Sequence, residues 1–133
     1  MRPALLCLIV AACGSDKPSA MPPKPPNTEL IVGEFERRPP VGTTAIRFRA
    51  DGSVAVAHDK TELDSKPAAQ GSWTLDGDKL TFTNERGLCA DAPGTRVGVY
   101  QVVISKVGIH FKKLEDRCDR RSTIDGQTWW RIK

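Results

Sequence analysis

From residue 28 onward the chain is made of short runs in which apolar and polar residues alternate, and turn-forming residues separate these runs. Alternation with a period of two is typical of β-strands that bury one face, and no segment sustains the 3.6-residue period of an amphipathic helix. Asp51-Gly52 and Asp76-Gly77-Asp78 are strong signals for tight hairpin turns. The sequence therefore predicts an all-β domain with eight strands, at residues 29–37, 43–49, 53–58, 70–75, 79–83, 96–105, 107–114 and 127–132.

Aromatic residues are spread along these runs, so that all but one of the predicted strands carry at least one ring. The rings belong to Phe35, Phe48, Trp73, Phe82, Tyr100, Phe111 and the Trp129-Trp130 pair. A sheet of this kind can bury its rings together by curling into a closed antiparallel barrel, which also leaves no unpaired edge. Eight strands enclose either a core of side chains or one small ligand. Neighbouring strand residues point to opposite faces, so we expect one of the two adjacent tryptophans in the core and the other at the rim or against a ligand.

The N-terminal residues carry a different pattern, in which a short apolar run ends in Val10-Ala11-Ala12 followed by Cys13. This arrangement resembles the lipobox of bacterial lipoproteins. The run is too short to span a bilayer core, which needs about 20 apolar residues. The resemblance implies that residues 1–12 are a cleaved signal peptide and that Cys13 becomes the lipidated first residue of a protein anchored in the cell envelope. Gly14 replaces the Asp that marks inner-membrane retention, which favours the outer membrane. An ordinary secretory signal cleaved after Ala12 is the alternative.

Residues 13–27 contain five prolines and no hydrophobic period. Proline-rich chain samples the extended polyproline II conformation, at about 3 Å per residue. We therefore expect a disordered tether here. The chain then has three parts: a signal peptide at residues 1–12, a lipidated cysteine with its tether at 13–27, and a barrel domain at 28–133.

The remaining cysteines follow from this processing, because Cys7 leaves with the signal peptide and Cys13 carries lipid. Cys89 and Cys118 are left as a pair, and in the oxidising cell envelope such a pair is most simply a disulfide. A metal site is the competing interpretation, but it needs three or four ligands at suitable spacing. The two histidines of the chain form no ligand motif with the cysteines. We therefore predict a disulfide, no metal and no cofactor.

Several short motifs follow one another in the predicted domain. Gly71-Ser72-Trp73 opens one hairpin, and Cys89, Gly98-Val99-Tyr100, Asp116-Arg117-Cys118-Asp119-Arg120-Arg121 and Trp129-Trp130-Arg131 come later. This order is similar to that of small lipocalin-like, or calycin-type, β-barrel domains in bacterial lipoproteins. The resemblance implies an eight-stranded antiparallel barrel.

The lipocalin resemblance also implies roles for individual residues. Gly33-Glu34-Phe35 stands where lipocalins carry a G-x-W motif, with Phe35 in place of the tryptophan. Arg131 matches the late arginine that packs on that ring, and an arginine over phenylalanine is a weaker cation-π contact than one over tryptophan. Asp116 and Arg121 are expected to brace the Cys118 loop through charge-assisted hydrogen bonds.

The net charge is small, at +4 for the chain and +3 once Arg2 is removed with the signal peptide, which argues against nucleic-acid binding. Basic residues near the C-terminus alternate with acidic ones, a pattern typical of a solvated face. A sharper hypothesis is that Arg117, Arg120 and Arg121 line the mouth of the barrel and bind an anionic ligand. Arg117, Arg120 and Trp130 are therefore candidate contacts for a ligand or a partner.

The sequence contains no Gly-rich phosphate loop, no G-x-S-x-G elbow and no histidine pair at metal spacing. His58 and His110 both lie in alternating strands, where a lone histidine is more often a partly exposed strand residue than a base. We therefore expect no enzyme, and a monomer. Two hypotheses remain: a barrel that binds a small apolar or amphipathic ligand, and a filled barrel whose loops contact or inhibit a protein partner.

Overall fold

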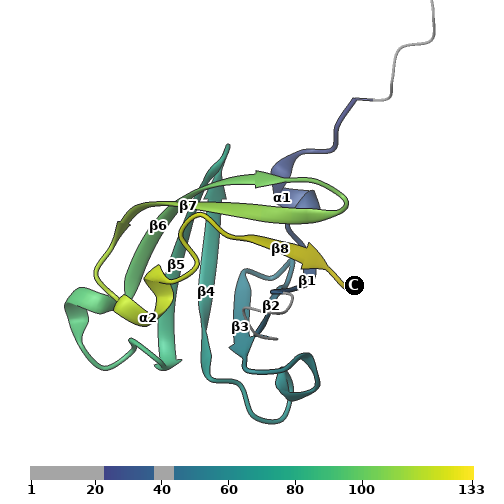
Figure 1. Cartoon of the computed structure of the whole chain (residues 1–133). Coiled ribbons are helices and arrows are strands. Elements are labelled where there is room, and N and C mark those ends of the chain that lie inside the picture. Colours follow the sequence, from purple (N-terminus) through teal and green to yellow (C-terminus); the bar gives the residue numbers. More distant parts are fainter. Residues whose placement is uncertain (1–22, 38–43) are drawn as a thin grey trace, which may run out of the picture.

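The eight strands close into an antiparallel barrel in which each strand pairs with its neighbours in the sequence and the last pairs with the first (Figure 1). The structure is a computed structural model that describes residues 23–37 and 44–133. The strands are β1 (Gly33–Glu36), β2 (Ala45–Phe48), β3 (Ser53–Ala57), β4 (Ala69–Asp76), β5 (Lys79–Gly87), β6 (Val97–Ile104), β7 (Gly108–Asp116) and β8 (Thr128–Arg131). The prediction of an all-β, eight-stranded antiparallel barrel is thus confirmed. The predicted signal peptide, Cys13 and most of the predicted tether lie outside the described residues.

The described residues also form four single helical turns, α1 (Asn27–Leu30), η2 (Lys60–Glu62), η3 (Pro93–Thr95) and α2 (Asp119–Ser122). Within the described ranges no helix has the length and apolar character needed to cross a membrane.

The beginning of the first predicted strand, 29–37, is wrong. Glu29 and Leu30 belong to α1, and β1 starts only at Gly33. The backbone N–H groups of Glu29 and Leu30 both donate to the carbonyl oxygen of Pro26, at 2.9 and 3.0 Å, so a helical turn begins directly after this proline. The side chains of Leu30 and Ile31 are buried in the core cluster, and their apolar character therefore reflects the closure of the barrel end rather than a strand.

The two predicted hairpin turns are present. Gly52 and Gly77 adopt φ angles of 91° and 65°, the left-handed region that glycine enters without steric cost. Asp51 supports the first turn because its Oδ1 accepts from the backbone N–H of Ser53 at 2.9 Å. These turns fix the register of β2 with β3 and of β4 with β5.

Most of the predicted rings meet inside the barrel. Phe35, Phe48, Phe82, Tyr100, Phe111 and Trp129 are each at most 3% exposed. Successive ring centroids lie 5.7 to 6.4 Å apart, a spacing typical of edge and tilted aromatic contacts. Trp73 is half-buried and packs edge-on against Phe48 at 5.9 Å. We refer to these seven rings as the aromatic layer.

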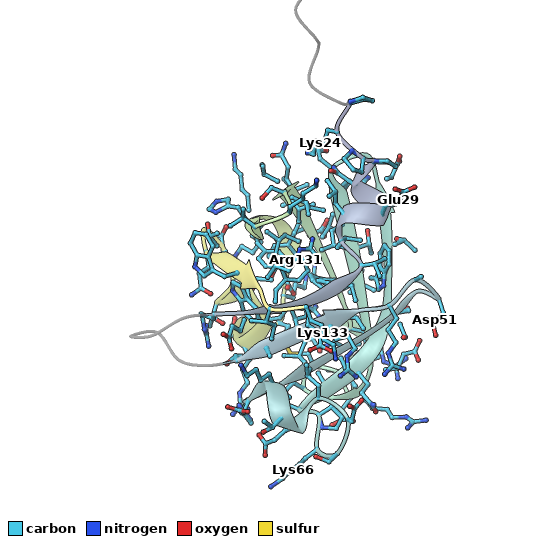
Figure 2. All side chains as sticks on the ribbon, turned by 90° about the vertical axis from the view of Figure 1, so that its right-hand side faces the viewer. Lys24, Glu29, Asp51, Lys66, Arg131 and Lys133 are labelled. Atoms are coloured by element: carbon cyan, nitrogen blue, oxygen red, sulfur yellow. A yellow bond between two sulfur atoms is a disulfide. The ribbon has the colours of Figure 1, made fainter. Side chains whose placement is uncertain are left out.

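The barrel has two unlike ends. At one end, the closed end, α1 packs beside the β4–β5 and β6–β7 turns, and the side chain of Asn27 donates to the carbonyl oxygen of Gly77 at 2.9 Å. The other end, the open end, carries the β3–β4, β5–β6 and β7–β8 loops (Figure 1). Lys24, before α1, and Lys66, in the β3–β4 loop, lie at opposite ends of the molecule (Figure 2). The chain therefore enters the barrel at the closed end, away from the open end.

Arg131 seals the closed end. Its guanidinium lies over the ring of Phe35, 4.5 Å from the centroid, between the start of the barrel and the C-terminal Lys133 (Figure 2). It donates to four backbone carbonyl oxygens, those of Leu30, Val32, Ser105 and Lys106. Gly33 makes room for it, because a Cβ at this position would lie 2.6 Å from Arg131 Nη1.

Candidate ligand-binding cavity

A cavity of about 320 Å³ opens at the open end of the barrel. Its lining comes from β2, β3, β4, β5 and β8, from residues beside the ends of these strands and of β1, and from the loops that carry α2 and Leu88. The lining residues are Arg37, Thr44, Ile46, Val54, Val56, Ala57, His58, Ala68, Ala69, Gln70, Phe82, Asn84, Leu88, Arg120, Arg121, Thr123, Ile124 and Trp129.

The inner part of the cavity is apolar. Phe82 and Trp129 belong to the aromatic layer, so this layer forms the floor. Ile46 and Val54, which alternate inward on β2 and β3, extend the apolar surface. The rings therefore fill the closed half of the barrel and leave the open half hollow.

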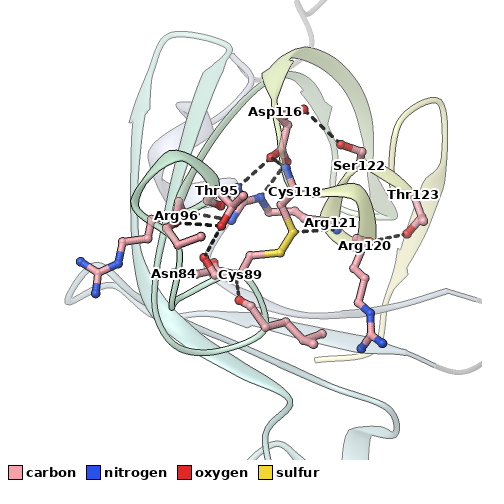
Figure 3. Close-up of a disulfide and its surroundings, with 12 residues drawn as sticks. Asn84, Cys89, Thr95, Arg96, Asp116, Cys118, Arg120, Arg121, Ser122 and Thr123 are labelled. Atoms are coloured by element: carbon pink, nitrogen blue, oxygen red, sulfur yellow. Dashed lines mark hydrogen bonds and ion pairs between the residues drawn. A yellow bond between two sulfur atoms is a disulfide. The ribbon is translucent and has the colours of Figure 1, made fainter.

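An ion pair between Asp116 and Arg121 braces the rim of the cavity (Figure 3). Arg121 donates through Nε to Asp116 Oδ2 at 2.7 Å and through Nη2 to Asp116 Oδ1 at 2.8 Å, which is a bidentate contact. The hydroxyl of Tyr100 donates to Asp116 Oδ2 at 2.5 Å, and the backbone N–H of Cys118 donates to Oδ1 at 2.9 Å. The side chains of Arg121 and Asp116 are only 9% and 0% exposed, so this pair is shielded from water.

The surroundings of Asp116 set the charge state of the brace. Burial by itself disfavours the ionised carboxylate, but hydrogen bonds from Arg121, Tyr100 and Cys118 outweigh it and lower the pKa of Asp116. Burial, followed by the neighbouring carboxylate, raises the pKa of the Tyr100 hydroxyl. At neutral pH the brace therefore holds an ionised aspartate and a protonated tyrosine.

The packing around Gly98 explains one spacing of the sequence, the glycine two residues before Tyr100. A Cβ at Gly98 would lie 2.6 Å from both Arg121 Nε and Asp116 Oδ2. The ion pair thus occupies the space that a side chain would need. The Gly-x-Tyr and Asp-x-Cys-x-x-Arg motifs of this chain therefore meet in space: Gly98 leaves room for the Asp116–Arg121 pair, and Tyr100 donates to Asp116.

Cys89 and Cys118 form a disulfide, with their Cα atoms 5.9 Å apart, as predicted. It links the β5–β6 loop to the β7–β8 loop beside the brace (Figure 3). Arg121 ties the same two loops, since it also donates to the carbonyl oxygens of Thr95 and Arg96 at 2.8 and 3.0 Å. A covalent bond and a set of charge-assisted hydrogen bonds therefore hold this side of the cavity rim.

The structure separates the arginines that the sequence grouped at the mouth of the barrel. Arg120 and Arg121 line the cavity, whereas Arg117 and Trp130 are not among its lining residues. Arg120 and Arg121 belong to α2, whereas Arg117 precedes this turn and Trp130 lies in β8, next to the inward-facing Trp129. The guanidinium of Arg121 binds Asp116 and backbone carbonyl oxygens. Of the two arginines of α2 that line the cavity, only Arg120 is exposed.

Arg37 is a cavity residue that the sequence analysis did not single out. It directly follows β1 and lies two residues after Phe35, so strand alternation places it on the same inward face. The one sign of this in the sequence is that a charged residue stands two positions after an inward-facing aromatic residue, where alternation predicts another inward-facing side chain. No motif contains this arginine, and its significance emerges only from the cavity.

No protein-family model matches the chain, and no curated protein or solved structure is significantly similar to it. Among the described residues no group of three or more His, Cys, Asp or Glu side chains is arranged to hold a metal ion.

Proposed function

We propose that this protein is a lipid-anchored lipoprotein of the bacterial cell envelope whose lipocalin-like barrel binds a small apolar or amphipathic ligand at its open end. The observation that carries the proposal is the cavity of about 320 Å³ with its apolar floor of Phe82, Trp129, Ile46 and Val54. Removing apolar surface from water stabilises a complex by about 25 cal/mol per Å². A hollow of this kind therefore favours a small-ligand barrel over a completely filled one.

The size of the cavity limits the ligand. Ligand pockets span about 300–1,000 Å³, and 320 Å³ lies at the lower end of this range. At roughly 30 Å³ per water-sized group, it holds about ten such groups. The ligand is thus a small molecule and not a long-chain lipid enclosed along its whole length.

The route of the chain supports an orientation for the anchored protein. The described chain enters at the closed end, where Asn27 contacts Gly77 and Arg131 contacts Leu30. A membrane anchor at Cys13 would then lie on the closed-end side, and the mouth of the cavity would face away from the membrane. The ligand would exchange with the aqueous phase. The disulfide fits an oxidising compartment outside the cytoplasm.

Ligand binding is tested by native mass spectrometry of the protein purified from its own host. We expect a co-purifying mass of a small molecule on the wild type. Val56→Phe fills the cavity that Val56 lines and should remove this mass. Val103→Phe adds the same ring to an outer-surface residue that is 68% exposed, and should retain it. Equal behaviour of the two variants, or no bound mass in any of them, would favour the filled-barrel hypothesis with a protein partner.

The anchor is tested separately by labelling cells with palmitate. We expect the wild-type protein to carry the label and the Cys13→Ser variant to lack it. Label in neither protein, together with release into the medium, would instead support ordinary secretion after cleavage behind Ala12.

A further inference from the structure

We propose that the ligand is a small amphipathic anion, whose charged head group binds the guanidinium groups of Arg37 and Arg120 while its apolar body lies against Phe82 and the strand residues below the rim. This inference rests on the proposed function, and it names the chemical class that the same cavity selects.

The first argument is the charge of the cavity lining. Three arginines contribute to it, and no aspartate or glutamate of the described residues does. The charge of Arg121 is balanced by Asp116, which stands behind the lining. Neither Arg37 nor Arg120 forms an ion pair within the described part of the chain. Two positive charges at the mouth are therefore not compensated by the barrel residues around them.

The second argument is the position of Arg37. Its Nη2 donates to Thr44 Oγ1 at 3.0 Å, and its Nη1 donates to Gln127 Oε1 at 3.4 Å, so both acceptors are neutral. Its guanidinium carbon lies 5.5 Å from the ring centroid of Trp129. These contacts hold the group in place from one side without cancelling its charge.

The Nε atom of Arg37 adds a specific feature. It is buried, and it has no hydrogen-bond partner among the described residues. A buried donor without an acceptor is costly, and more so on a charged group. An anionic oxygen would accept from this guanidinium and also compensate its charge. The planar fork of arginine suits a carboxylate because two oxygens can accept two parallel hydrogen bonds.

Arg120 complements Arg37 at the rim. It lines the cavity from α2, and its residue is exposed, so its guanidinium can move to meet a ligand. Arg121 next to it cannot take this role, because Asp116 and two backbone carbonyls occupy its donors. The head group thus meets one positioned cation and one adaptable cation.

The apolar body of the ligand follows from the depth of the cavity. Below the arginines the lining consists largely of Phe82, Ile46 and Val54, which offer no charged partner. A strongly polar or multiply charged molecule would lose hydration there without compensation. The volume admits about ten water-sized groups, at roughly 30 Å³ each, which matches a carboxylate with an apolar chain of about eight carbons.

Octanoate is therefore the probe, with 1-octanol as its neutral counterpart of almost the same size. Binding to the full-length protein is measured by isothermal titration calorimetry, and the ¹⁵N-indole signal of Trp129 reports whether the ligand enters the cavity. We expect both ligands to shift this signal and octanoate to bind about tenfold or more tighter, because a charge-assisted hydrogen bond is worth roughly this factor.

Variants then assign the head-group site. Arg37→Gln should reduce octanoate affinity about tenfold and leave octanol affinity unchanged, with Arg37→Lys between the two. Arg120→Gln, at an exposed position, should reduce octanoate affinity by a few-fold. Arg117→Gln removes the same charge from a residue that does not line the cavity, and it should bind both ligands as the wild type does.

The outcomes distinguish this inference from the proposed function. If octanol shifts the Trp129 signal and octanoate binds no tighter, the anion inference is overturned and an apolar-ligand barrel remains. If neither ligand shifts the signal, the proposed function fails with it. Should Arg37→Gln not fold, Arg120→Gln still tests the site, and we expect the few-fold reduction of octanoate affinity there and not in Arg117→Gln. An unchanged octanoate affinity in Arg120→Gln, or the same reduction in Arg117→Gln, would contradict the site.

Discussion

Each end of the barrel is held by an arginine that packs against a glycine, but the two arginines have different partners. At each end an arginine occupies space that a glycine leaves open and ties separate loops together, Arg131 beside Gly33 and Arg121 beside Gly98. Arg131 donates only to backbone carbonyls and packs on a ring. Arg121 also pairs with a buried carboxylate, next to a disulfide.

This difference shows which of the two arginine contacts is sensitive to pH and to redox conditions. Backbone carbonyls and a phenylalanine ring neither titrate nor undergo redox chemistry in the physiological range, so the contacts of Arg131 at the closed end are insensitive to pH and to reductants. The open end depends on an ionised aspartate and an oxidised cysteine pair. The contacts that frame the cavity thus depend on pH and on redox state, whereas the contacts of Arg131 at the closed end do not.

The comparison is tested most severely by Asp116→Asn. The substitution leaves Arg121 in a site where its side chain is only 9% exposed, now without its negative partner. Removing one member of a buried ion pair typically costs about 3–5 kcal/mol. We expect a loss of this size in the free energy of unfolding, measured by urea denaturation, and almost none for Glu115→Gln at the exposed neighbouring position. A loss below about 1 kcal/mol would mean that the brace is not a buried pair in energetic terms.

The disulfide should give the next largest effect. Cys89 and Cys118 are separated by 29 positions, and closing a loop of this length stabilises a fold by about 3.5 kcal/mol in the chain-entropy model. The Cys89→Ala/Cys118→Ala double variant should lose this amount, and reductant should lower the melting temperature of the wild type but not of the variant. Hydrogen exchange should speed up in the loops of the open end and stay unchanged around α1. Faster exchange at both ends would contradict their independence.

Arg131→Met should have a smaller effect. The thioether chain keeps part of the packing on Phe35, but the substitution removes the donors to the carbonyls of Leu30, Val32, Ser105 and Lys106. We expect a cost of about 2 kcal/mol, because hydrogen bonds are lost without leaving an opposite charge buried. Arg121→Met serves as the comparison, because it leaves the buried Asp116 without its positive partner. In thermal and urea denaturation, Arg121→Met should be less stable than Arg131→Met. The reverse order would remove the distinction between the two ends.

The pH dependence should be the smallest effect and the most specific. The folded state lowers the pKa of Asp116, so the brace contributes fully above the ordinary carboxyl pKa of about 4 and loses this contribution as the pH falls through the lower folded-state value. The stability gap between wild type and Asp116→Asn should therefore narrow from about pH 6 to about pH 3.

The gap between wild type and Arg131→Met serves as the control over the same pH range. It should stay constant, because the acceptors of Arg131 do not titrate. Asp51, Asp59 and Asp64 also have lowered pKa values, but they are present in all three proteins and cancel in the comparison. A pH-independent gap for Asp116→Asn would contradict the assigned role.

The sequence was sufficient to predict the barrel because local signals and the global fold agree. The Asp-Gly turns fix two hairpins, and alternation places Phe48, Phe82 and Phe111 on the inner face. The error at Glu29 and Leu30 arose where apolar residues serve a cap, because periodicity alone does not tell a buried helical turn from a short strand.

The candidate site was less predictable because it depends on distances between segments far apart in the chain. Gly98 and Arg121 stand 23 positions apart in sequence and meet only through the pairing of β6 with β7. Arg117 and Arg120 look equivalent in sequence, yet only Arg120 lines the cavity. Arg37 belongs to no linear motif, and it stands out only because the described residues of the cavity lining include no aspartate or glutamate.

The pairing of β8 with β1 has a consequence for how the molecule is made. Phe35 pairs with Arg131, and the backbone N–H of Glu34 donates to the carbonyl oxygen of Lys133 at 2.8 Å. β8, which closes the barrel, is thus the last of its strands to leave the ribosome, and β1 cannot pair with β8 before then. Contacts of such long sequence separation form late, because the loop-closure entropy must be overcome first. Synthesis should therefore deliver an open chain, the state in which a polypeptide can be threaded through a translocation channel before it folds.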